Sequence, residues 1–402
     1  MYSIINDFAI MFLVVAAISF FIKLIKQPII LGYIISGFIF SLLMGSGVAG
    51  DQIMSMAELG ITFLLFLMGI EFSLSSLKYL GKDLFIATTL QTIILFFVAF
   101  VSAKLIGFNT NESIYLAILF MFSSTLLVAK WVEDKKETSS LHGKITLGIL
   151  VVQDIFAILI LSILNLFKET GIEGIMLVPL KGFILIAIAF IFAKYILNTI
   201  FKFALRYPEL MFVLSLGICF LFVGISPLLG YSTSIGAFIA GVTLANTEYK
   251  NDILSRLKPL IIFFNMLFFV GMGFQLDTDF APHAVSLITT FLVLCFIIKP
   301  IIVYLTLKLR GYDLRTSFKA ALNLSQFSEF GMIIIFAGIA IGLVPTEIGP
   351  IAILLIVATM AISSYFIKYE SFLFGYCENG LKKIDVLFKS KKNDEESKNL
   401  KG

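Results

Sequence analysis

Long apolar runs make up most of the chain, and short segments with charged residues, Gly or Pro separate them. A helix of about 20 apolar residues is long enough to cross the hydrocarbon core of a bilayer. The pattern predicts thirteen transmembrane helices, over residues 4–22, 28–46, 53–72, 84–106, 112–132, 144–167, 175–201, 209–226, 228–246, 257–275, 283–307, 316–341 and 347–374. We therefore expect an all-α polytopic membrane protein.

The composition agrees with this pattern. Hydrophobic residues are 59% of the chain and charged residues 14%, whereas soluble domains have about 45–50% and about 25%. The three cysteines, Cys219, Cys295 and Cys377, are widely spaced, so neither a disulfide framework nor a metal site is expected. No cofactor is predicted.

The basic residues predict how the chain is oriented. If the N-terminus lies outside, the outer loops hold only Lys104, Lys168 and Lys181, and Lys299 lies within a span. The remaining 26 of the 30 Lys and Arg residues then fall in inner loops and the C-terminal tail, as cytoplasmic loops require. We expect a multi-pass protein of the cell membrane with a cytoplasmic C-terminus. Residues 1–376 would form the transmembrane domain and residues 377–402 a short charged tail.

Two pairs of similar segments indicate an internal repeat. LGYIISGFI from Leu31 resembles LGYSTSIGAFIAG from Leu229, and LLFLMGIEF at residues 64–72 resembles MLFFVGMGF at residues 266–274. Both pairs join one span to the span seven later. An odd offset reverses orientation, which predicts two inverted six-helix repeats with span seven as the linker. Such repeats are typical of secondary transporters, whose sites lie where interrupted helices meet. Chance similarity between apolar segments is the alternative.

Spans five and twelve both contain polar interruptions at places that the repeat relates. Small polar side chains can satisfy backbone groups that are freed when a membrane helix unwinds. We interpret both spans as broken, crossing helices. Alternatively, these side chains only bond back to their own helices or join neighbouring ones. The residues concerned are Ser123, Ser124 and Thr125 in span five, and Asn323, Ser325, Gln326, Ser328 and Glu329 in span twelve.

Span six carries an acid in the middle of the apolar run ILVVQDIFAILIL. Asp154 lies near the predicted midplane, where a charge costs about 2.5–3.5 kcal/mol on insertion scales. We interpret it as a carboxylate that binds either a proton or a monovalent metal cation. A structural pairing with Lys299 is the alternative. Gln153 points about 100° away from Asp154 on a helix, and we expect it to tie span six to a crossing helix or to Lys299.

Lys299 is a second costly charge within a predicted span. Its partner could be Asp154 or Glu329. It could equally neutralise the partial charges at the facing ends of the crossing helices. The sequence leaves these alternatives open.

With SST in one span, QD in the next, then KP and QFSEFG, the chain resembles the monovalent cation:proton antiporter family 2, the Kef and Nap branch, over residues 4–374. The resemblance implies the sodium/proton antiporter fold. Spans 4–6 and 11–13 would form the moving transport core, and spans 1–3 and 8–10 a scaffold that dimerises. By this likeness Asp154 binds the cation and the proton, with Ser124, Thr125 and Gln153 beside it. The crossing region and its charge compensation would use Ser123, Ser325, Gln326, Glu329 and Lys299.

The resemblance implies exchange of K⁺ or Na⁺ for H⁺, for pH and salt homeostasis, by a homodimer in the bilayer. Similar electrogenic proteins carry two adjacent aspartates, so Gln153 predicts electroneutral 1:1 exchange; the Gln-Asp pair favours K⁺ without excluding Na⁺. The chain departs from full-length Kef proteins in having no nucleotide-binding domain after span thirteen. Ligand gating would therefore need a separate regulatory subunit.

Other classes of function fit the sequence less well. A cation channel or leak pathway on the same fold is the main alternative, although no filter-like carbonyl motif is evident. A symporter for organic anions would need a basic or aromatic pocket, which is not seen. An enzyme is not expected, because His142 and His283 fall in opposite loops without catalytic spacing and resemble ordinary loop histidines. Nothing suggests nucleic-acid binding.

Overall fold

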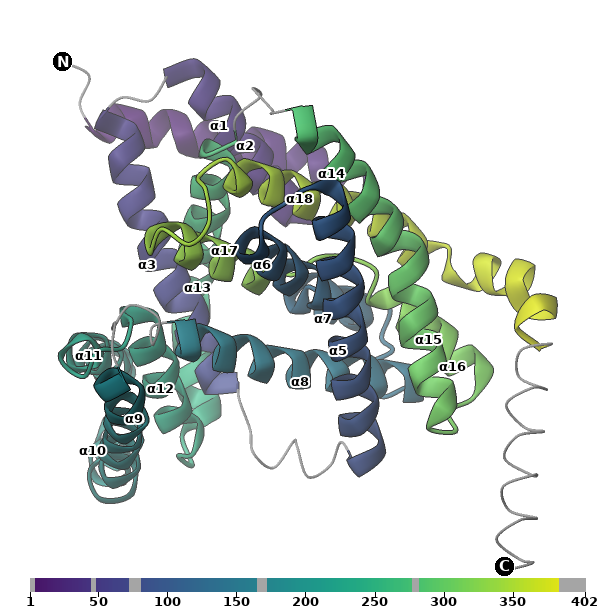
Figure 1. Cartoon of the computed structure of the whole chain (residues 1–402). Coiled ribbons are helices and arrows are strands. Elements are labelled where there is room, and N and C mark those ends of the chain that lie inside the picture. Colours follow the sequence, from purple (N-terminus) through teal and green to yellow (C-terminus); the bar gives the residue numbers. More distant parts are fainter. Residues whose placement is uncertain (1–3, 45–47, 72–80, 165–171, 277–281, 383–402) are drawn as a thin grey trace, which may run out of the picture. The chain divides into compact units, whose positions relative to one another are not determined.

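A computed structural model describes residues 4–44, 48–71, 81–164, 172–276 and 282–382, and regular structure in these residues is helical throughout (Figure 1). The contacts divide the chain into two compact units. Unit 1 comprises residues 1–76 and 158–276, and unit 2 comprises residues 77–157 and 277–402. The all-α fold predicted from the apolar pattern is confirmed.

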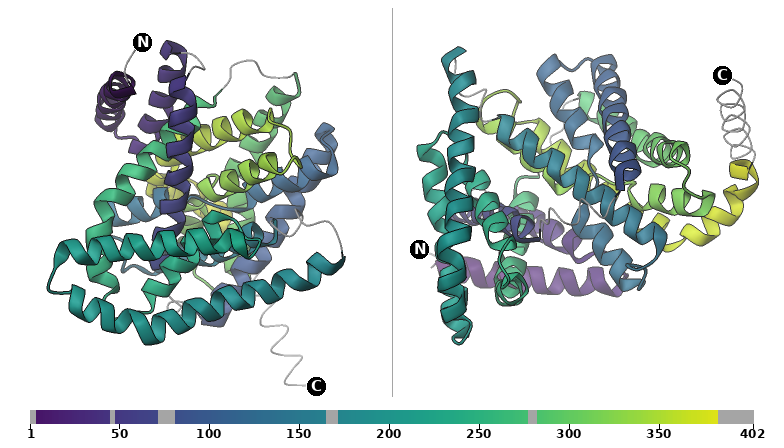
Figure 2. Two further views of the ribbon diagram at one scale, coloured as in Figure 1. Left: turned by 90° about the vertical axis from the view of Figure 1, so that its left-hand side faces the viewer. Right: turned by 90° about the horizontal axis from the view of Figure 1, so that it is seen from below.

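Unit 1 consists of two groups of helices that are separate in the sequence. A π-helical turn, η2, joins α9 to α10, and Figure 2 shows the three as one long rod. Buried Phe, Leu, Ile and Ala side chains of α3 and of α9 to α13 form its main hydrophobic core. The helices of this unit are α1 (Ile4–Leu24), α2 (Ile29–Met44), α3 (Val48–Glu71), α9 (Ile172–Phe192), η2 (Ala193–Leu197), α10 (Asn198–Ala204), α11 (Pro208–Leu228), α12 (Thr233–Ala245) and α13 (Lys250–Phe274).

Glycines let two pairs of helices in unit 1 approach backbone to backbone. A Cβ atom added at Gly69 of α3 would lie 2.2 Å from the carbonyl oxygen of Phe238 in α12. One added at Gly273 of α13 would lie 1.8 Å from the carbonyl oxygen of Ile34 in α2. The repeat predicted from the sequence relates α2 to α12 and α3 to α13. It therefore maps the contact between α3 and α12 onto the contact between α13 and α2. The packing of unit 1 therefore agrees with inverted repeats.

Unit 2 contains two interrupted helices and, among the described residues, the two longest apolar helical stretches, Gly81–Ile106 and Ala284–Leu309. A second π-helical turn, η3, lies directly before Lys299 and Pro300, where the proline removes one backbone donor from the helix. The helices of this unit are α5 (Gly81–Ile106), α6 (Thr110–Met121), α7 (Thr125–Asp134), α8 (Leu141–Leu164, assigned to unit 2 through Ala157), α14 (Pro282–Val293), η3 (Leu294–Ile298), α15 (Lys299–Leu309), α16 (Leu314–Asn323), α17 (Glu329–Ala340) and α18 (Ile348–Lys368).

The two breaks are at the predicted places. The chain is not helical between α6 and α7 at residues 122–124, nor between α16 and α17 at residues 324–328. Ser124 and Ser328 are the N-caps of α7 and α17, and their hydroxyl oxygens accept hydrogen bonds from backbone N–H groups of the first turns. The α6 and α17 halves pack against each other (Figure 1). The prediction of two broken, crossing helices is confirmed.

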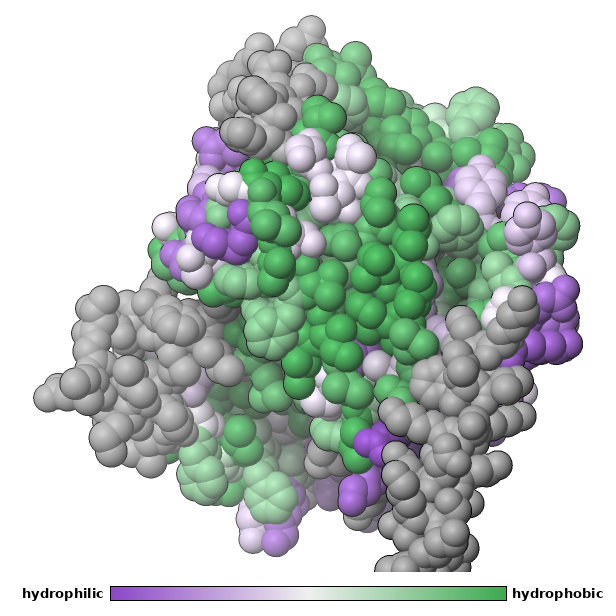
Figure 3. All heavy atoms as spheres, turned by 45° about the vertical axis from the view of Figure 1, so that its right-hand side comes forward, coloured by the Kyte–Doolittle hydropathy of each residue, from purple (hydrophilic) through white to green (hydrophobic). Residues whose placement is uncertain are grey.

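The described helices lie over all thirteen predicted spans, but not all are long. Nine helical stretches are long and apolar enough to cross a membrane, and three further apolar helices of the described chain are shorter. Large apolar side chains such as Phe97, Leu105 and Ile301 are exposed, and Figure 3 shows a face where hydrophobic residues form a continuous area. The chain is thus a multi-pass membrane protein. The exact count of spans, the orientation of the termini and the tail beyond Lys382, which lies outside the described residues, stay predictions.

Candidate functional site

Asp154 lies half-buried on α8, about 20 Å along the helix from its first residue. The hydroxyl oxygen of Thr125, the first residue of α7, is 3.0 Å from each Asp154 carboxylate oxygen. The acid in the middle of the apolar run is therefore held at the point where the broken helix α6–α7 resumes. The structure brings together the two residues that the sequence placed in consecutive spans.

Lys299 binds the carbonyl ends of both broken helices. Its ammonium group is fully buried and donates hydrogen bonds to the carbonyl oxygens of Phe120, Phe122 and Gln326 at 3.0, 2.7 and 2.8 Å. An ammonium group has three donors, so all of them are used. The C-terminal ends of α6 and α16 carry partial negative charge. The sequence left open whether Lys299 pairs with an acid or neutralises the ends of the broken helices. In the structure its ammonium group contacts the helix ends.

Glu329 lies at the opposite, amide ends of the same helices. It is the first residue of α17 and is fully buried. Its Oε1 accepts a long hydrogen bond of 3.4 Å from the backbone N–H of Leu126, and Ser124 and the Thr125 amide also face it. Its Oε2 has no hydrogen-bond partner among the described residues. Helix N-termini carry partial positive charge, so a carboxylate suits this position.

Gln153 and Ser123 join the elements around the acid. The Gln153 amide oxygen accepts a hydrogen bond from the Ser123 backbone N–H at 3.0 Å, and its amide nitrogen donates to the Met121 carbonyl at 3.5 Å. The Ser123 hydroxyl donates to the Leu324 carbonyl at 2.9 Å. Gln153 thus ties α8 to the first break, the first of the two arrangements expected for it, and Ser123 ties the first break to the second.

Other polar residues of the breaks serve the local backbone. The hydroxyl of Ser325 donates to the Ala321 carbonyl, and the amide nitrogen of Gln326 donates to the Asn323 carbonyl. Sequence reasoning missed Thr359 of α18, whose hydroxyl accepts a hydrogen bond of 3.2 Å from the Phe327 N–H. Nothing distinguishes Thr359 in the sequence, since an isolated Thr in an apolar helix is common.

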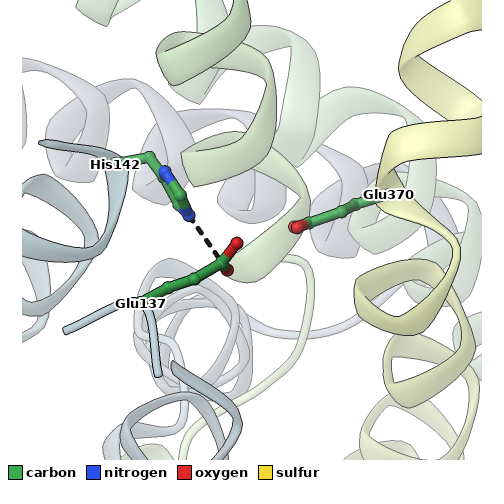
Figure 4. Close-up of side chains that lie close together, drawn as sticks. All are labelled: Glu137, His142 and Glu370. Carbon is green, nitrogen blue, oxygen red and sulfur yellow. Dashed lines mark hydrogen bonds and ion pairs between the residues drawn. The ribbon is translucent and has the colours of Figure 1, made fainter. Parts of the chain in front are cut away.

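A second polar group was also missed. Lys135, Glu137, His142, Lys319 and Glu370 form a mostly buried group of charges, which we call the end cluster. Figure 4 shows its two acids and its histidine, with the side chains converging from separate elements. The interpretation of His142 as an ordinary loop histidine is wrong, because it lies in the first turn of α8 and its Nε2 is 3.1 Å from the Glu137 carboxylate. No sequence motif marks the cluster, because Lys319 and Glu370 are far along the chain from Lys135, Glu137 and His142.

Comparison with known proteins fits this arrangement of broken helices around a buried acid. Residues 9–369 match the family described as "Sodium/hydrogen exchanger, transmembrane". The chain belongs to this family. The resemblance to monovalent cation:proton antiporters is thereby confirmed. The named relatives of this chain are transporters, in agreement with the prediction that the chain is not an enzyme.

Individual relatives differ in length from this chain. "K(+) efflux antiporter 5" of Arabidopsis thaliana is 28% identical over 83% of this chain, which spans 60% of that protein. "Na(+)/H(+)-K(+) antiporter GerN" of Bacillus cereus is 24% identical over 85% of this chain and 90% of its own length. The solved structure of the sodium proton antiporter MjNhaP1 from Methanocaldococcus jannaschii has a TM-score of 0.64, 14% identity, and coverage of 92% and 97%. The last likeness shows that the fold is that of sodium/proton antiporters.

Proposed function

We propose that this exchanger moves K⁺ or Na⁺ across the cell membrane in exchange for H⁺, and that cation and proton compete for Asp154. The observation that carries the proposal is the contact between this mid-helix carboxylate and Thr125 at the break of α6–α7. Relatives named as K⁺ efflux and Na⁺/H⁺ antiporters support the choice of reaction.

The Thr125 hydroxyl suits both states of the acid. When Asp154 is ionised, the hydroxyl donates to it, and the hydroxyl lone pairs face a neighbouring cation. When Asp154 is protonated, the hydroxyl can turn and accept a hydrogen bond from the carboxyl O–H group, since a hydroxyl is both donor and acceptor. Monovalent metal cations are bound by carboxylate, hydroxyl and carbonyl oxygens, which a broken membrane helix makes available. Occupation by one ion excludes the other, which is sufficient for exchange.

The neighbouring charges of the crossing would stay fixed during the cycle. Lys299 is held by three carbonyl oxygens, and Glu329 lies at two helix N-termini. Asp154 is then the one group of the site that changes its charge, so one cation would be exchanged for one proton. Ser124, Ser123, Gln153, Ser325 and Gln326 would shape this region, as their contacts with the breaks suggest.

The arrangement in the membrane is part of the proposal. Unit 2 contains every candidate site residue and would be the transport core, while the glycine-mediated packing of unit 1 suits a rigid scaffold that forms a homodimer. The N-terminus would lie outside and the C-terminus in the cytoplasm. We expect K⁺ to be preferred, and regulation by a separate subunit remains part of this proposal.

Exchange by the purified protein in proteoliposomes tests the proposal. An imposed pH gradient is followed with a pH-sensitive dye while K⁺, Na⁺ and Li⁺ are added separately. Asp154→Asn should abolish both cation and proton movement, because an amide neither titrates nor balances a cation. Glu133→Gln, at a side chain 69% exposed on α7, is the matched control and should retain exchange. Exchange by Asp154→Asn would contradict the assignment, and cation flux without proton counterflow would instead support a channel or leak pathway.

A further inference from the structure

Lys299 contacts one backbone peptide group in each of the two breaks. Its ammonium nitrogen is 2.7 Å from the carbonyl oxygen of Phe122 and 2.8 Å from that of Gln326. Each carbonyl shares a peptide group with the N–H of the next residue, Ser123 in the first break and Phe327 in the second. The C=O and N–H of a trans peptide group are coplanar and point in opposite directions. Whatever holds the N–H therefore also sets the direction of the carbonyl that faces the ammonium group.

A side chain on a neighbouring helix holds the N–H end of each peptide group. The N–H of Ser123 donates to Oε1 of Gln153 on α8 at 3.0 Å. The N–H of Phe327 donates to Oγ1 of Thr359 on α18 at 3.2 Å. The two acceptors follow the amides that they bind by 30 and 32 residues, and the repeat predicted from the sequence relates α8 to α18. Thr359 is therefore the counterpart of Gln153 in the second half of the chain.

Thr359 serves the backbone of the second break. Its side chain is fully buried, and its own O–H donates to the Ile356 carbonyl of α18 at 3.1 Å. The hydroxyl oxygen is thereby left to accept from the Phe327 N–H, a buried donor that needs an acceptor. The residue after Thr359 is the buried Met360, whereas Asp154 follows the acceptor of the first break. The second half thus keeps the backbone contact without the acid.

The position of the Lys299 ammonium group depends on both breaks. Two of its acceptors, the carbonyls of Phe120 and Phe122, lie at the end of α6 and in the first break. The third, the carbonyl of Gln326, lies in the second break. If this third carbonyl turned away, the ammonium group would be held from the first break alone. That is the break at which Asp154 is bound.

We propose that Thr359 is a positioning residue for cation binding. By holding the peptide group of residues 326–327, it keeps the Lys299 ammonium group shared between the two breaks and so limits its repulsion of a cation at Asp154. This inference rests on the proposed cation–proton exchange. Repulsion between two cations rises as they approach and is strong where the dielectric constant is low. A shift of the ammonium group toward the first break would weaken cation binding while the carboxylate that binds the cation stays in place.

The kinetics of Thr359 variants in proteoliposomes test this role. Thr359→Val has nearly the same shape but offers no acceptor to the Phe327 N–H. We expect the apparent KM for the cation that wild type exchanges to rise about three- to tenfold, the equivalent of one lost hydrogen bond. The maximal rate should stay within about twofold of wild type, because the change affects binding of the cation. Thr359→Ser retains the hydroxyl and should keep the KM of wild type.

Thr92→Val is the matched control. Thr92 is a buried threonine of α5, also in unit 2, and its hydroxyl donates to the Thr88 carbonyl of its own helix. The same loss of a hydroxyl there should leave KM unchanged.

Two further measurements apply even if Thr359→Val does not fold. Thr359→Cys and Thr359→Ser have side chains of similar size, but sulfur is only a weak acceptor, so the cysteine variant should have the raised KM and the serine variant should not. Hydrogen–deuterium exchange reports on the contact itself. Amides of the second break should lose protection in the valine or cysteine variant and keep it in the serine variant.

Two kinetic results would overturn the role of Thr359. One is a folded valine or cysteine variant with the KM of wild type, and the other is a fall in maximal rate at unchanged KM, which a packing defect alone would produce. Unchanged protection of the second break would overturn it as well. Each of these leaves the proposed function standing if wild type exchanges cations and Asp154→Asn does not. If wild type shows no exchange, the proposed function fails, and the role of Thr359 fails with it.

Discussion

At the scale of single residues, two buried charges of the crossing are placed by backbone dipoles rather than by each other. Lys299 donates hydrogen bonds to carbonyl oxygens at the C-terminal ends of α6 and α16. Glu329 lies at the N-terminal ends of α7 and α17, where backbone N–H groups face it. A buried lysine without an adjacent acid is costly unless its three donors are satisfied. Three short bonds to carbonyl oxygens meet this requirement. Lys299 therefore stabilises the break as well as setting its charge.

Replacing Lys299 should lower the thermal stability of the protein. Lys299→Met has a similar size but leaves the carbonyls of Phe120, Phe122 and Gln326 buried without this donor. Each unsatisfied buried group costs about 1–3 kcal/mol, so we expect the melting temperature in detergent to fall by several degrees. Lys144→Ala, at an exposed position of α8, is the control and should be nearly neutral. Equal melting temperatures for Lys299→Met and wild type would show that the three bonds contribute little.

At the scale of helices, unit 1 depends on close backbone contact between α3 and α12. A side-chain carbon at Gly69 would overlap the Phe238 carbonyl of the opposite helix, which is backbone and cannot turn aside. Gly217 in α11 has nothing within 4 Å of such a carbon. The same substitution should thus have opposite effects at these two helical glycines.

Gly69→Ala should separate α3 from α12 and lower the melting temperature. Overpacking of this kind costs about 1–3 kcal/mol. Gly217→Ala should be neutral or slightly stabilising, because alanine favours a helix over glycine by about 1 kcal/mol. Thermal unfolding of both variants in one detergent makes the comparison direct. A Gly69→Ala variant as stable as Gly217→Ala would mean that the two helices can move apart without cost.

The helices and their breaks were predictable from the sequence, whereas the contacts between distant elements were not. Span length and apolar runs are local properties, and Ser-rich interruptions mark a place where the backbone needs other partners. The triplet at residues 123–125 did not reveal that Thr125 turns to Asp154 while Ser124 caps α7. The partner of Lys299 was undecided because carbonyl oxygens carry no sequence signal. The end cluster was missed for a different reason. Its charges on α16 and after α18 meet those of the α7–α8 turn only when the chain folds.

At the scale of the whole molecule, the end cluster bears on the predicted topology. Lys135 lies at the end of predicted span five, His142 at the start of span six, Lys319 at the start of span twelve and Glu370 at the end of span thirteen. Alternating spans require all four ends to lie on one side of the membrane. The structure joins them within unit 2. The positive-inside distribution would make this side cytoplasmic.

The number of charges moved in each proposed exchange cycle is a property of the whole molecule and follows from which groups titrate. If Lys299 and Glu329 keep their charges and Asp154 alone exchanges cation for proton, no net charge crosses the membrane. An electrogenic cycle would instead gain about 2.3 kcal/mol per net charge for each 100 mV. We therefore expect the rate of Na⁺/H⁺ exchange in proteoliposomes to stay the same when a membrane potential of about 100 mV is imposed. The potential is set by diffusion of an ion other than K⁺, so that no potassium gradient acts on the protein. The Glu329→Gln variant separates the two acids: if it exchanges at all, its rate should also be independent of voltage. A rate that follows the imposed potential in wild type and loses this dependence in Glu329→Gln would mean that Glu329 carries a second proton.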